Sequence, residues 1–276
     1  MNRLNIIVLG KDGMLGHMVY NYLKDLDNHN IVGLGKKEFD ATWDNTLMYA
    51  KLDEYEPNFI INCIGHLNKN SEEEKKETWY LNTTFPNILA DIGDEMGFSL
   101  IHISSDCAFD NNTYGMSKLA GEIRRANHLT IRTSIIGPEL KEGSGLLHWF
   151  IRQDGEVNGY ENHLWNGVTT LQLSEFIFYC IKGNFHTQTN LIDYRIEPGV
   201  SKFELLNLIK ESLGKDIKIN KFSTNLVDKR QAPEGSYTLY IPETRDLKEQ
   251  LKILINWIKN KKHIYNNIYP EFYQND

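Results

Sequence analysis

Cysteine is scarce in this chain, and long apolar runs are missing. Only three of the 276 residues are cysteines, and Cys63, Cys107 and Cys180 lie far apart without a C-x-x-C spacing. This pattern excludes a disulfide framework and supports no zinc or other metal site. Every apolar run is much shorter than the roughly 18 residues that a membrane-spanning helix needs. The sequence therefore predicts neither a metal site nor a membrane segment.

An excess of positive charge is missing as well. The formal net charge is -7 at pH 7, whereas nucleic acids and anionic membranes are bound by basic surfaces. The first residues lead directly into an apolar strand pattern, without the longer apolar region and small-residue cleavage site of a secretory signal. We therefore expect a cytoplasmic protein that binds neither nucleic acid nor a membrane.

Present instead are short apolar segments that alternate with amphipathic ones. Apolar runs of this kind are typical of parallel strands buried on both faces. Their alternation with helices predicts a Rossmann-type α/β fold with a doubly wound parallel sheet and, where the pattern loosens beyond residue 137, a smaller C-terminal α/β lobe. The main expected strands cover residues 5–10, 31–35, 57–65, 99–104 and 129–137, and expected helices include 17–26, 42–51, 114–125, 144–153, 170–181, 202–213 and 247–259.

Three glycines follow the first expected strand at the spacing Gly10-x-x-Gly13-x-x-Gly16. Gly10 permits a tight turn, Gly13 lets backbone N–H groups approach a pyrophosphate, and Gly16 allows close packing of helix on strand. An ordinary glycine-rich turn is the alternative. Because ligands of doubly wound sheets bind at the carboxyl ends of the strands, we expect a dinucleotide to contact this turn and the turn after the third strand, through Gly10, Asp12, Gly13, Met14, Leu15, Cys63, Ile64 and Gly65.

The residues after the second expected strand bear on the choice of dinucleotide. An acidic side chain there binds the ribose 2′-OH of NAD, whereas this sequence offers Lys36 and Lys37. The sequence therefore predicts NADPH, with NADH as the alternative cofactor, unless both lysines are simply solvated. Asp40 is expected either to contact the adenine end or to cap the helix over 42–51. Residues 1–140 are predicted to form the main part of an NADP-binding domain, and 141–276 mainly a substrate-binding lobe, with some segments returning to the first domain.

The strongest candidate for catalysis is the stretch from Ser104 to Lys118. It places Ser105 at the end of an expected strand, and it places Tyr114 and Lys118 four residues apart on one face of the helix predicted over 114–125. A cation beside a phenol favours the phenolate, which lowers the pKa of the tyrosine and eases proton exchange near neutrality. A surface helix with a solvated tyrosine and lysine is the alternative.

Four motifs occur in a characteristic order: Gly10-x-x-Gly13-x-x-Gly16, Ile103-Ser-Ser-Asp106, Tyr114-Gly-Met-Ser-Lys118-x-x-Gly121-Glu122 and Leu129-Thr-Ile-Arg132-Thr. In them the chain resembles the extended short-chain dehydrogenase/reductase superfamily, and within it the dTDP-4-dehydrorhamnose reductases. The resemblance implies an NAD(P)H-dependent oxidoreductase of deoxysugar biosynthesis for a polysaccharide or glycan. Its substrate would be a nucleoside-diphosphate 4-keto-6-deoxyhexose, whose 4-keto group is reduced.

The resemblance also implies roles for individual residues. Ser105 would hydrogen-bond the substrate carbonyl, Tyr114 would protonate it, and Lys118 would hold the nicotinamide ribose and lower the tyrosine pKa. Tyr114 and Lys118 would thus contact the cofactor as well. Two polar segments, 162–170 and 229–233, are read as substrate-facing loops or as ordinary surface loops. The expected substrate contacts are Ser105, Asp106, Cys107, Trp165, Asn166 and Arg230.

Two departures from the family pattern bear on the substrate. Ser105 and Tyr114 are only nine positions apart (114 − 105), where the family has a longer loop that borders the substrate. Cys107-Ala108 replaces a bulkier pair. Together with Trp165-Asn166 and the segment Leu129–Leu140, this looks more similar to relatives acting on UDP-linked 2-acetamido sugars than to those acting on dTDP- or UDP-linked 4-dehydrorhamnose.

Two other functions stay open at this point. One is an epimerase or dehydratase that retains NAD, against which the pair Lys36-Lys37 counts. The other is a non-catalytic NADP-binding regulatory subunit, because the regulatory subunit of methionine adenosyltransferase also resembles this family. An intact set of Ser105, Tyr114 and Lys118 favours catalysis. A homodimer is compatible with the sequence.

Overall fold

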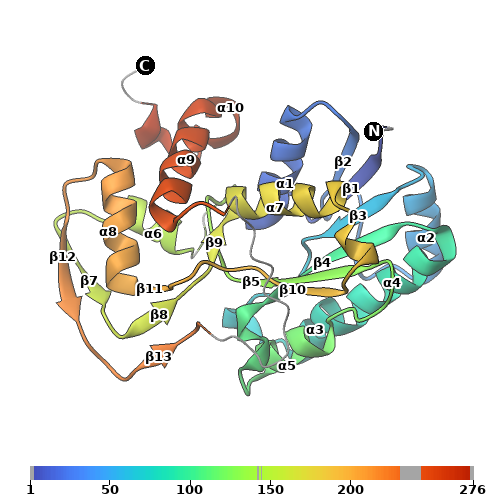
Figure 1. Ribbon diagram of the computed structural model, residues 1–276, viewed down its shortest axis with the longest axis horizontal. Coiled ribbons are helices and arrows are strands. Elements are labelled where there is room, and N and C mark those ends of the chain that lie inside the picture. Colours follow the sequence, from blue (N-terminus) through green and yellow to red (C-terminus); the bar gives the residue numbers. More distant parts are fainter. Residues whose placement is uncertain (1–2, 142, 144, 231–243, 274–276) are drawn as a thin grey trace. The chain divides into compact units, whose positions relative to one another are not determined.

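The computed structural model of the protein describes residues 3–141, 143, 145–230 and 244–273. The chain divides into two compact units (Figure 1). Of the described residues, the first unit holds 3–133 and 174–194, and the second holds the remainder. None of the helices among the described residues combines the length and the apolar character needed to cross a bilayer.

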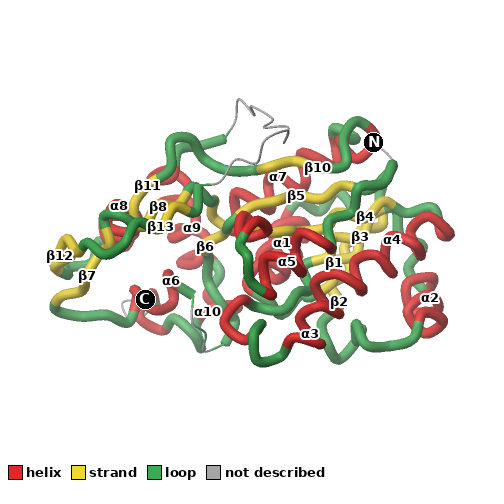
Figure 2. The backbone as a smooth tube through the Cα atoms, turned by 90° about the horizontal axis from the view of Figure 1, so that it is seen from below, coloured by secondary structure: helices red, strands yellow, loops and turns green. Residues whose placement is uncertain are grey.

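Six parallel strands form the sheet of the first unit, in the order β10-β5-β4-β3-β1-β2 that Figure 2 shows from top to bottom. The first strand pairs with β2 on one side and with β3 on the other. The chain thus changes direction across β1, which is where open α/β sheets bind their ligands. The predicted Rossmann-type sheet is confirmed, with strands β1 (Asn5–Leu9), β2 (Asn30–Leu34), β3 (Phe59–Asn62), β4 (Ser99–Ser105), β5 (Leu129–Thr133) and β10 (Leu191–Asp193).

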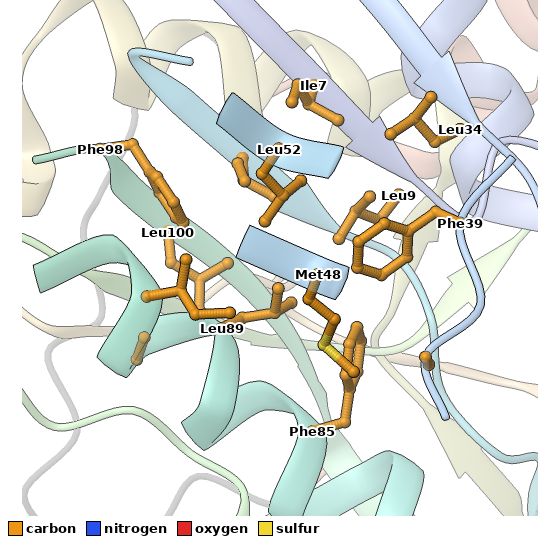
Figure 3. Close-up of a cluster of buried hydrophobic side chains, with 14 of the residues drawn as sticks. Ile7, Leu9, Leu34, Phe39, Met48, Leu52, Phe85, Leu89, Phe98 and Leu100 are labelled. Carbon is orange, nitrogen blue, oxygen red and sulfur yellow. The ribbon is translucent and has the colours of Figure 1, made fainter. Parts of the chain in front are cut away.

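Helices cover both faces of this sheet, with α1 and α7 on one face and α3, α4 and α5 on the other (Figure 1). A buried apolar cluster fills the space between the sheet and helices α2 and α4 (Figure 3). Ile7, Leu9, Ile60 and Leu100 enter it from the strands because their neighbours in sequence point to the opposite face. The helices are α1 (Met14–Asp25), α2 (Asn45–Asp53), α3 (Lys75–Trp79), α4 (Phe85–Met96), α5 (Thr113–Ala120) and α7 (Thr170–Lys182).

Several predicted boundaries are wrong. Helix α1 begins at Met14, directly after Gly13. Helix α2 begins at Asn45 because the Asp44 side chain caps it by accepting from the Leu47 N–H at 3.0 Å. Asp40, which we considered as that cap, instead accepts from the backbone N–H of Thr42 at 2.9 Å.

Helix α5 also ends earlier than predicted, at Ala120 instead of residue 125. A Cβ atom on the next residue, Gly121, would lie 1.8 Å from the carbonyl oxygen of Asn82. The chain is therefore packed directly against the π-helical turn Tyr80–Thr84 that joins α3 to α4. Glu122 then turns into the protein interior, where it is 8% exposed.

The second unit carries three small sheets, in which β8 pairs with β11 and β13, β7 with β12, and β6 with β9. The predicted loop over 162–170 is wrong, because it contains β8 (His163–Trp165) and β9 (Val168–Thr169). The strand expected over 129–137 is split at Ser134 into β5 and β6. The remaining strands are β6 (Ile135–Ile136), β7 (Glu156–Tyr160), β11 (Val200–Ser201), β12 (Lys218–Phe222) and β13 (Val227–Asp228).

The helices of the second unit agree better with the sequence pattern. Helix α8 begins with the expected Ser-x-x-Glu signal, in which the Ser201 hydroxyl accepts from the Glu204 N–H at 3.1 Å. Helix α6 is shorter than the predicted 144–153, and residue 144 lies outside the described residues. The helices are α6 (Leu146–Ile151), α8 (Lys202–Leu213), α9 (Leu247–Asn260) and α10 (Lys262–Tyr265).

Candidate active site

The glycine-rich turn between β1 and α1 has the geometry that the spacing predicts. Gly10 has a φ of 80°, which favours glycine. A Cβ atom on Gly16 would lie 2.0 Å from the Gly10 carbonyl oxygen. Gly13 is the N-cap residue of α1. Among the described residues, a Cβ atom on Gly13 would meet nothing closer than 3.4 Å, and no side chain caps the helix. Packing of the protein thus explains Gly10 and Gly16 but not Gly13, whose exposed position at a helix N-terminus suits a phosphate group.

The turn after β3 lies against this glycine turn. The Cys63 N–H donates to the carbonyl of Leu9 at 3.1 Å, and a Cβ atom on Gly10 would lie 3.1 Å from Cγ1 of Ile64. Loss of hydration raises the pKa of the Cys63 thiol to about 12, which keeps it protonated. The turn is thus a neutral, close-fitting wall beside the glycine turn.

Ser105 and Tyr114 meet despite the short interval between them. The Ser105 hydroxyl lies at the end of β4, where it accepts from the Cys107 N–H at 3.1 Å, and the Tyr114 side chain is hydrogen-bonded to it. The interval is compact because the Asn112 side chain caps α5 at Gly115, accepting from that N–H at 2.8 Å. Nine positions are therefore enough to bring the predicted hydroxyl and phenol together.

Lys118 lies one helical turn beyond Tyr114, and its ammonium is almost completely buried. Nζ donates to the carbonyl of Ile103 at 2.8 Å. On the other side, a Cβ atom on Gly65 would lie 3.6 Å from Nζ. The lysine therefore joins the end of β4 to the turn after β3, which brings the predicted catalytic residues and the predicted cofactor wall together.

The protonation states differ from the sequence prediction. Although Tyr114 is only partly buried, loss of hydration raises the pKa of its phenol to about 12, against the opposing hydrogen bond to Ser105. Burial lowers the pKa of the Lys118 ammonium to about 8, against the opposing charge of Glu122. The net shift of the tyrosine pKa is thus upward, opposite to the predicted lowering, because desolvation of the phenol dominates; the effect of Lys118 on the phenol stays a prediction. A phenol that keeps its proton at neutral pH suits a proton donor.

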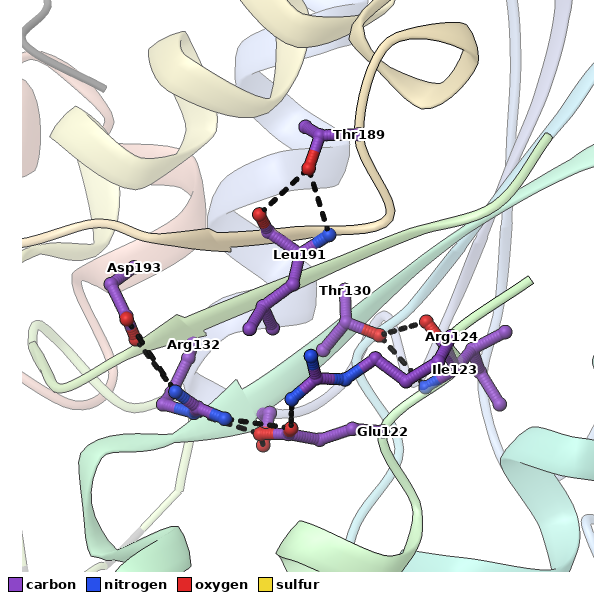
Figure 4. Close-up of polar contacts among 9 residues, drawn as sticks. Glu122, Ile123, Arg124, Thr130, Arg132, Thr189, Leu191 and Asp193 are labelled. Carbon is purple, nitrogen blue, oxygen red and sulfur yellow. Dashed lines mark hydrogen bonds and ion pairs between the residues drawn. The ribbon is translucent and has the colours of Figure 1, made fainter. Parts of the chain in front are cut away.

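A buried ion-pair network around Arg132 and Glu122, drawn in Figure 4, reaches the residue next to Ser105. Arg132 donates to both carboxylate oxygens of Glu122, at 2.8 and 2.7 Å, and Nη1 of Arg132 donates to Asp193 at 3.2 Å. Ser104, the neighbour of Ser105, donates to Glu122 at 3.1 Å. The Arg132 guanidinium also lies 4.6 Å from the centre of the Phe109 ring. The network thus ties together the ends of β4, β5 and β10 and the residues after α5.

The residues after β2 include one that the sequence argument overlooked. Lys36 is exposed, which fits both a solvated lysine and a lysine that is accessible to a ligand. Glu38, however, turns back to the end of β2, where it accepts from the Gly35 N–H at 2.9 Å and pairs with Lys11 at 3.1 Å. The premise that this strand end lacks an acidic side chain is therefore wrong. The signal in the sequence is an acid three residues after a glycine, which can bond back to the turn.

The predicted substrate contacts fall in both units. Asp106 and Cys107 lie in the 3-10 turn directly after Ser105. In the second unit Trp165 is buried, and its indole N–H donates to Ser134 at 2.8 Å, while Asn166 is buried beside it. Arg230 is exposed, and it donates to the Asp228 carboxylate through its backbone N–H and through two guanidinium hydrogen bonds. Residues 231–233 of the same predicted loop lie outside the described residues.

Within the described part of the chain, His66, Glu74 and Glu77 could in principle hold a metal ion, since their ligand atoms lie within 4.8 Å of one another. Both carboxylates are exposed, and Nε2 of His66 already lies 2.7 Å from Glu74. Exposed groups of this composition are readily explained as a hydrogen-bonded surface cluster, so we assign no metal to it.

The family model described as "RmlD substrate binding domain" matches residues 4–216. The chain belongs to this family. This membership confirms the predicted resemblance to the dTDP-4-dehydrorhamnose reductases. A crystal structure of dTDP-4-dehydrorhamnose reductase from Bacillus anthracis in complex with NADP has the same fold, with a TM-score of 0.77 and 20% identity over 92% of this chain and 99% of that one.

Curated relatives of this RmlD-family chain match it over shorter stretches. The probable low-salt glycan biosynthesis reductase Agl14 of Haloferax volcanii is 31% identical over 140 residues, which cover 42% of this chain and 46% of that protein. dTDP-4-dehydrorhamnose reductase of Salmonella typhimurium is 28% identical over 152 residues, 48% of this chain and 51% of the enzyme. Methionine adenosyltransferase 2 subunit beta of Xenopus laevis is 28% identical over 137 residues, 42% of this chain and 41% of that protein. The chain thus spans about half the length of the curated relatives it matches.

Proposed function

We propose that this protein reduces the 4-keto group of a nucleoside-diphosphate 4-keto-6-deoxyhexose, with NADPH as hydride donor and NADH as the alternative, in the biosynthesis of a glycan. The observation that carries the proposal is the contact between Ser105 and Tyr114, with the buried Lys118 one helical turn away. These groups lie on the first unit beside the change of chain direction in its sheet. Membership of the RmlD family and the reductases among its relatives support it.

The residues present fit a dinucleotide. The uncapped N-terminus of α1, with Gly13 exposed, would hold the pyrophosphate, and the turn Cys63–Gly65 with Lys118 would hold the nicotinamide ribose. When bound, the reduced nicotinamide supplies the hydride that adds to C4 of the sugar. No metal is required by this chemistry.

The protein's own groups handle the proton. Ser105 hydrogen-bonds the keto oxygen and Tyr114 donates its phenolic proton to that oxygen, which completes the alcohol. The raised pKa of Tyr114 keeps this proton in place until charge develops on the oxygen. Lys118, whose pKa is lowered, lies one helical turn beyond Tyr114 on α5. Its positive charge stabilises the phenolate that forms on Tyr114. Water then reprotonates the phenolate.

The sugar is proposed only as a class. A UDP-linked 2-acetamido sugar is supported by Cys107-Ala108, Trp165-Asn166 and the segment Leu129–Leu140, and the relatives give it no support over a dTDP-linked sugar. We test the class by offering the 4,6-dehydratase products of UDP-GlcNAc, UDP-glucose and dTDP-glucose, each with NADPH and with NADH. One 4-keto sugar is expected to be reduced, and the loss of cofactor absorbance measures the rate.

A non-catalytic regulatory subunit is the second candidate, favoured by the similarity to methionine adenosyltransferase 2 subunit beta. The two functions differ in the same assay. A subunit would bind the dinucleotide and a partner protein tightly but would consume no cofactor with any of the three ketosugars, and that result would reject the reductase.

The expected homodimer is part of the proposal. Analytical ultracentrifugation of the full chain measures whether it forms.

A further inference from the structure

Opposite charges meet at the carboxyl end of β2. Lys11, from the glycine turn, is held there because its backbone N–H donates to the carbonyl of Leu34 at 3.3 Å. Its Nζ lies 3.1 Å from Oε1 of Glu38, and Oε2 of the same carboxylate accepts from the Gly35 N–H at 2.9 Å. The Glu38 carboxylate thus binds both an ammonium group and a backbone N–H at this strand end.

Two more charges lie next to this ion pair. The Asp12 carboxylate lies over Gly35, where a Cβ atom would be 2.0 Å from Oδ2 of Asp12. Lys36 is exposed, and its charge adds to the hydrogen bonds from Thr42 that lower the pKa of the Asp40 carboxyl. In dinucleotide-binding sheets a carboxylate at this strand end binds the ribose 2′-OH, and a basic side chain accommodates a 2′-phosphate. Here the chain offers both kinds of group, and they are bonded to each other.

We propose that Glu38 is a specificity-determining residue that competes with the 2′-phosphate of NADPH for Lys11. With the ion pair closed, the carboxylate is placed to accept from a 2′-OH; with it open, Lys11 and Lys36 are placed to bind a 2′-phosphate. The inference rests on the proposed function, since it presupposes dinucleotide binding at the glycine turn. The ion pair supplies a group for each dinucleotide, whereas the lysines alone would bind only a 2′-phosphate.

Because the Lys11–Glu38 ion pair is partly exposed, a 2′-phosphate can compete with Glu38 for Lys11. The Lys11 and Glu38 side chains are 27% and 43% exposed, and exposed ion pairs are weak enough for a doubly charged phosphate to displace. The neighbouring Glu38 charge still opposes the phosphate after displacement, because a unit charge a few ångströms away is felt even in water. The need to break the ion pair, and the remaining repulsion from Glu38, therefore lower the affinity for NADPH without abolishing it.

The test measures binding of NADP⁺ and NAD⁺ by calorimetry to the full chain. Glu38→Gln keeps the side-chain shape but removes the charge, and we expect it to raise the NADP⁺/NAD⁺ affinity ratio by about tenfold. Lys11→Met is expected to lower that ratio by about tenfold. The matched control is Glu54→Gln, which removes the same charge from the exposed pair of Lys51 and Glu54 on and after α2, 2.6 Å apart; its ratio should stay at the wild-type value.

Salt supplies a second readout. The effects of Glu38→Gln and Lys11→Met on the ratio should shrink as ionic strength rises, because screening at about 0.5 M salt acts within a few ångströms. Binding of both dinucleotides by all variants with a ratio unchanged within about twofold would overturn this inference alone. Failure of the wild-type chain to bind either dinucleotide would instead overturn the proposed function, and the inference with it.

Discussion

The ends of β4 and β2 both carry charged side chains of the first unit, and they differ in burial. At the end of β4, Lys118, Glu122 and Arg132 are almost completely buried, and their charges are bound by several partners. At the end of β2, Lys11 and Glu38 are partly exposed. Burial makes the pairing of Arg132 with Glu122 costly to break and shifts the pKa of Lys118 strongly, whereas exposure at β2 leaves charges that a ligand can rearrange.

Removing a charge from the buried network should have the largest effect. Arg132→Met leaves the carboxylates of Glu122 and Asp193 without their main partner, which should lower the free energy of unfolding by about 3–5 kcal/mol. The control is Arg124→Met, because Arg124 binds the same Glu122 but its side chain is 51% exposed; about 1 kcal/mol or less is expected there. Equal losses in urea unfolding of the two variants would remove the distinction between buried and exposed partners.

The buried ammonium should make stability depend on pH. The folded-state pKa of Lys118, about 8, is below its ordinary value of 10.5, so the unfolded chain binds more protons between these values. Stability from this group therefore rises as pH increases through that window, by about 2–3 kcal/mol between pH 8 and pH 10. The measurement is the difference in unfolding free energy between wild type and Lys118→Met at the two pH values. A difference that stays constant would show that the ammonium is not buried.

Substitutions at two glycines of the glycine-rich turn between β1 and α1 should have different effects on stability and on dinucleotide binding. Gly16→Ala places a Cβ atom 2.0 Å from a carbonyl oxygen and should lower both stability and dinucleotide affinity. Gly13→Ala meets nothing closer than 3.4 Å, so stability should stay within about 0.5 kcal/mol. Its affinity for NADP⁺ should still fall by about tenfold, since a methyl group would weaken hydrogen bonds to the pyrophosphate. Unchanged affinity in Gly13→Ala would place the pyrophosphate elsewhere.

Helix caps contribute much less to stability than the buried network does, and two of them distinguish an effect on stability from an effect on the site. Asn112→Ala and Asp44→Ala each remove a side chain that caps a helix, α5 and α2 respectively, and each should cost about 1 kcal/mol of stability. Only Asn112→Ala should also lower turnover, because α5 carries Tyr114 and Lys118. Equal turnover in the two variants would mean that the start of α5 does not position the site.

The sequence predicts local features of this molecule well. Apolar runs locate the strands of the first unit, and the spacing of Tyr114 and Lys118 places both on α5, since each signal lies within a few residues. Contacts between distant residues were not predictable in the same way. The pairing of Arg132 with Asp193 joins residues 61 positions apart, and nothing local in either residue specifies it.

Short strands and side-chain directions were also missed. In the second unit, β8 and β9 are too short to show a periodic pattern, so the sequence predicts a loop for this polar segment. At β2 the position of Glu38 was visible in the sequence, but the return of its carboxylate to Gly35 depends on the conformation of the turn. The sign of the Tyr114 pKa shift likewise depends on burial that the spacing of residues does not give.

The central claim is that Tyr114 donates the proton to the substrate carbonyl. The most direct test compares turnover of the ketosugar that proves to be the substrate by wild type, Tyr114→Phe and the control Tyr49→Phe, an exposed tyrosine on α2. We predict that Tyr114→Phe loses turnover by about a hundredfold or more, while NADPH binding and the Tyr49→Phe rate stay at wild-type values. A wild-type rate in Tyr114→Phe would contradict the account.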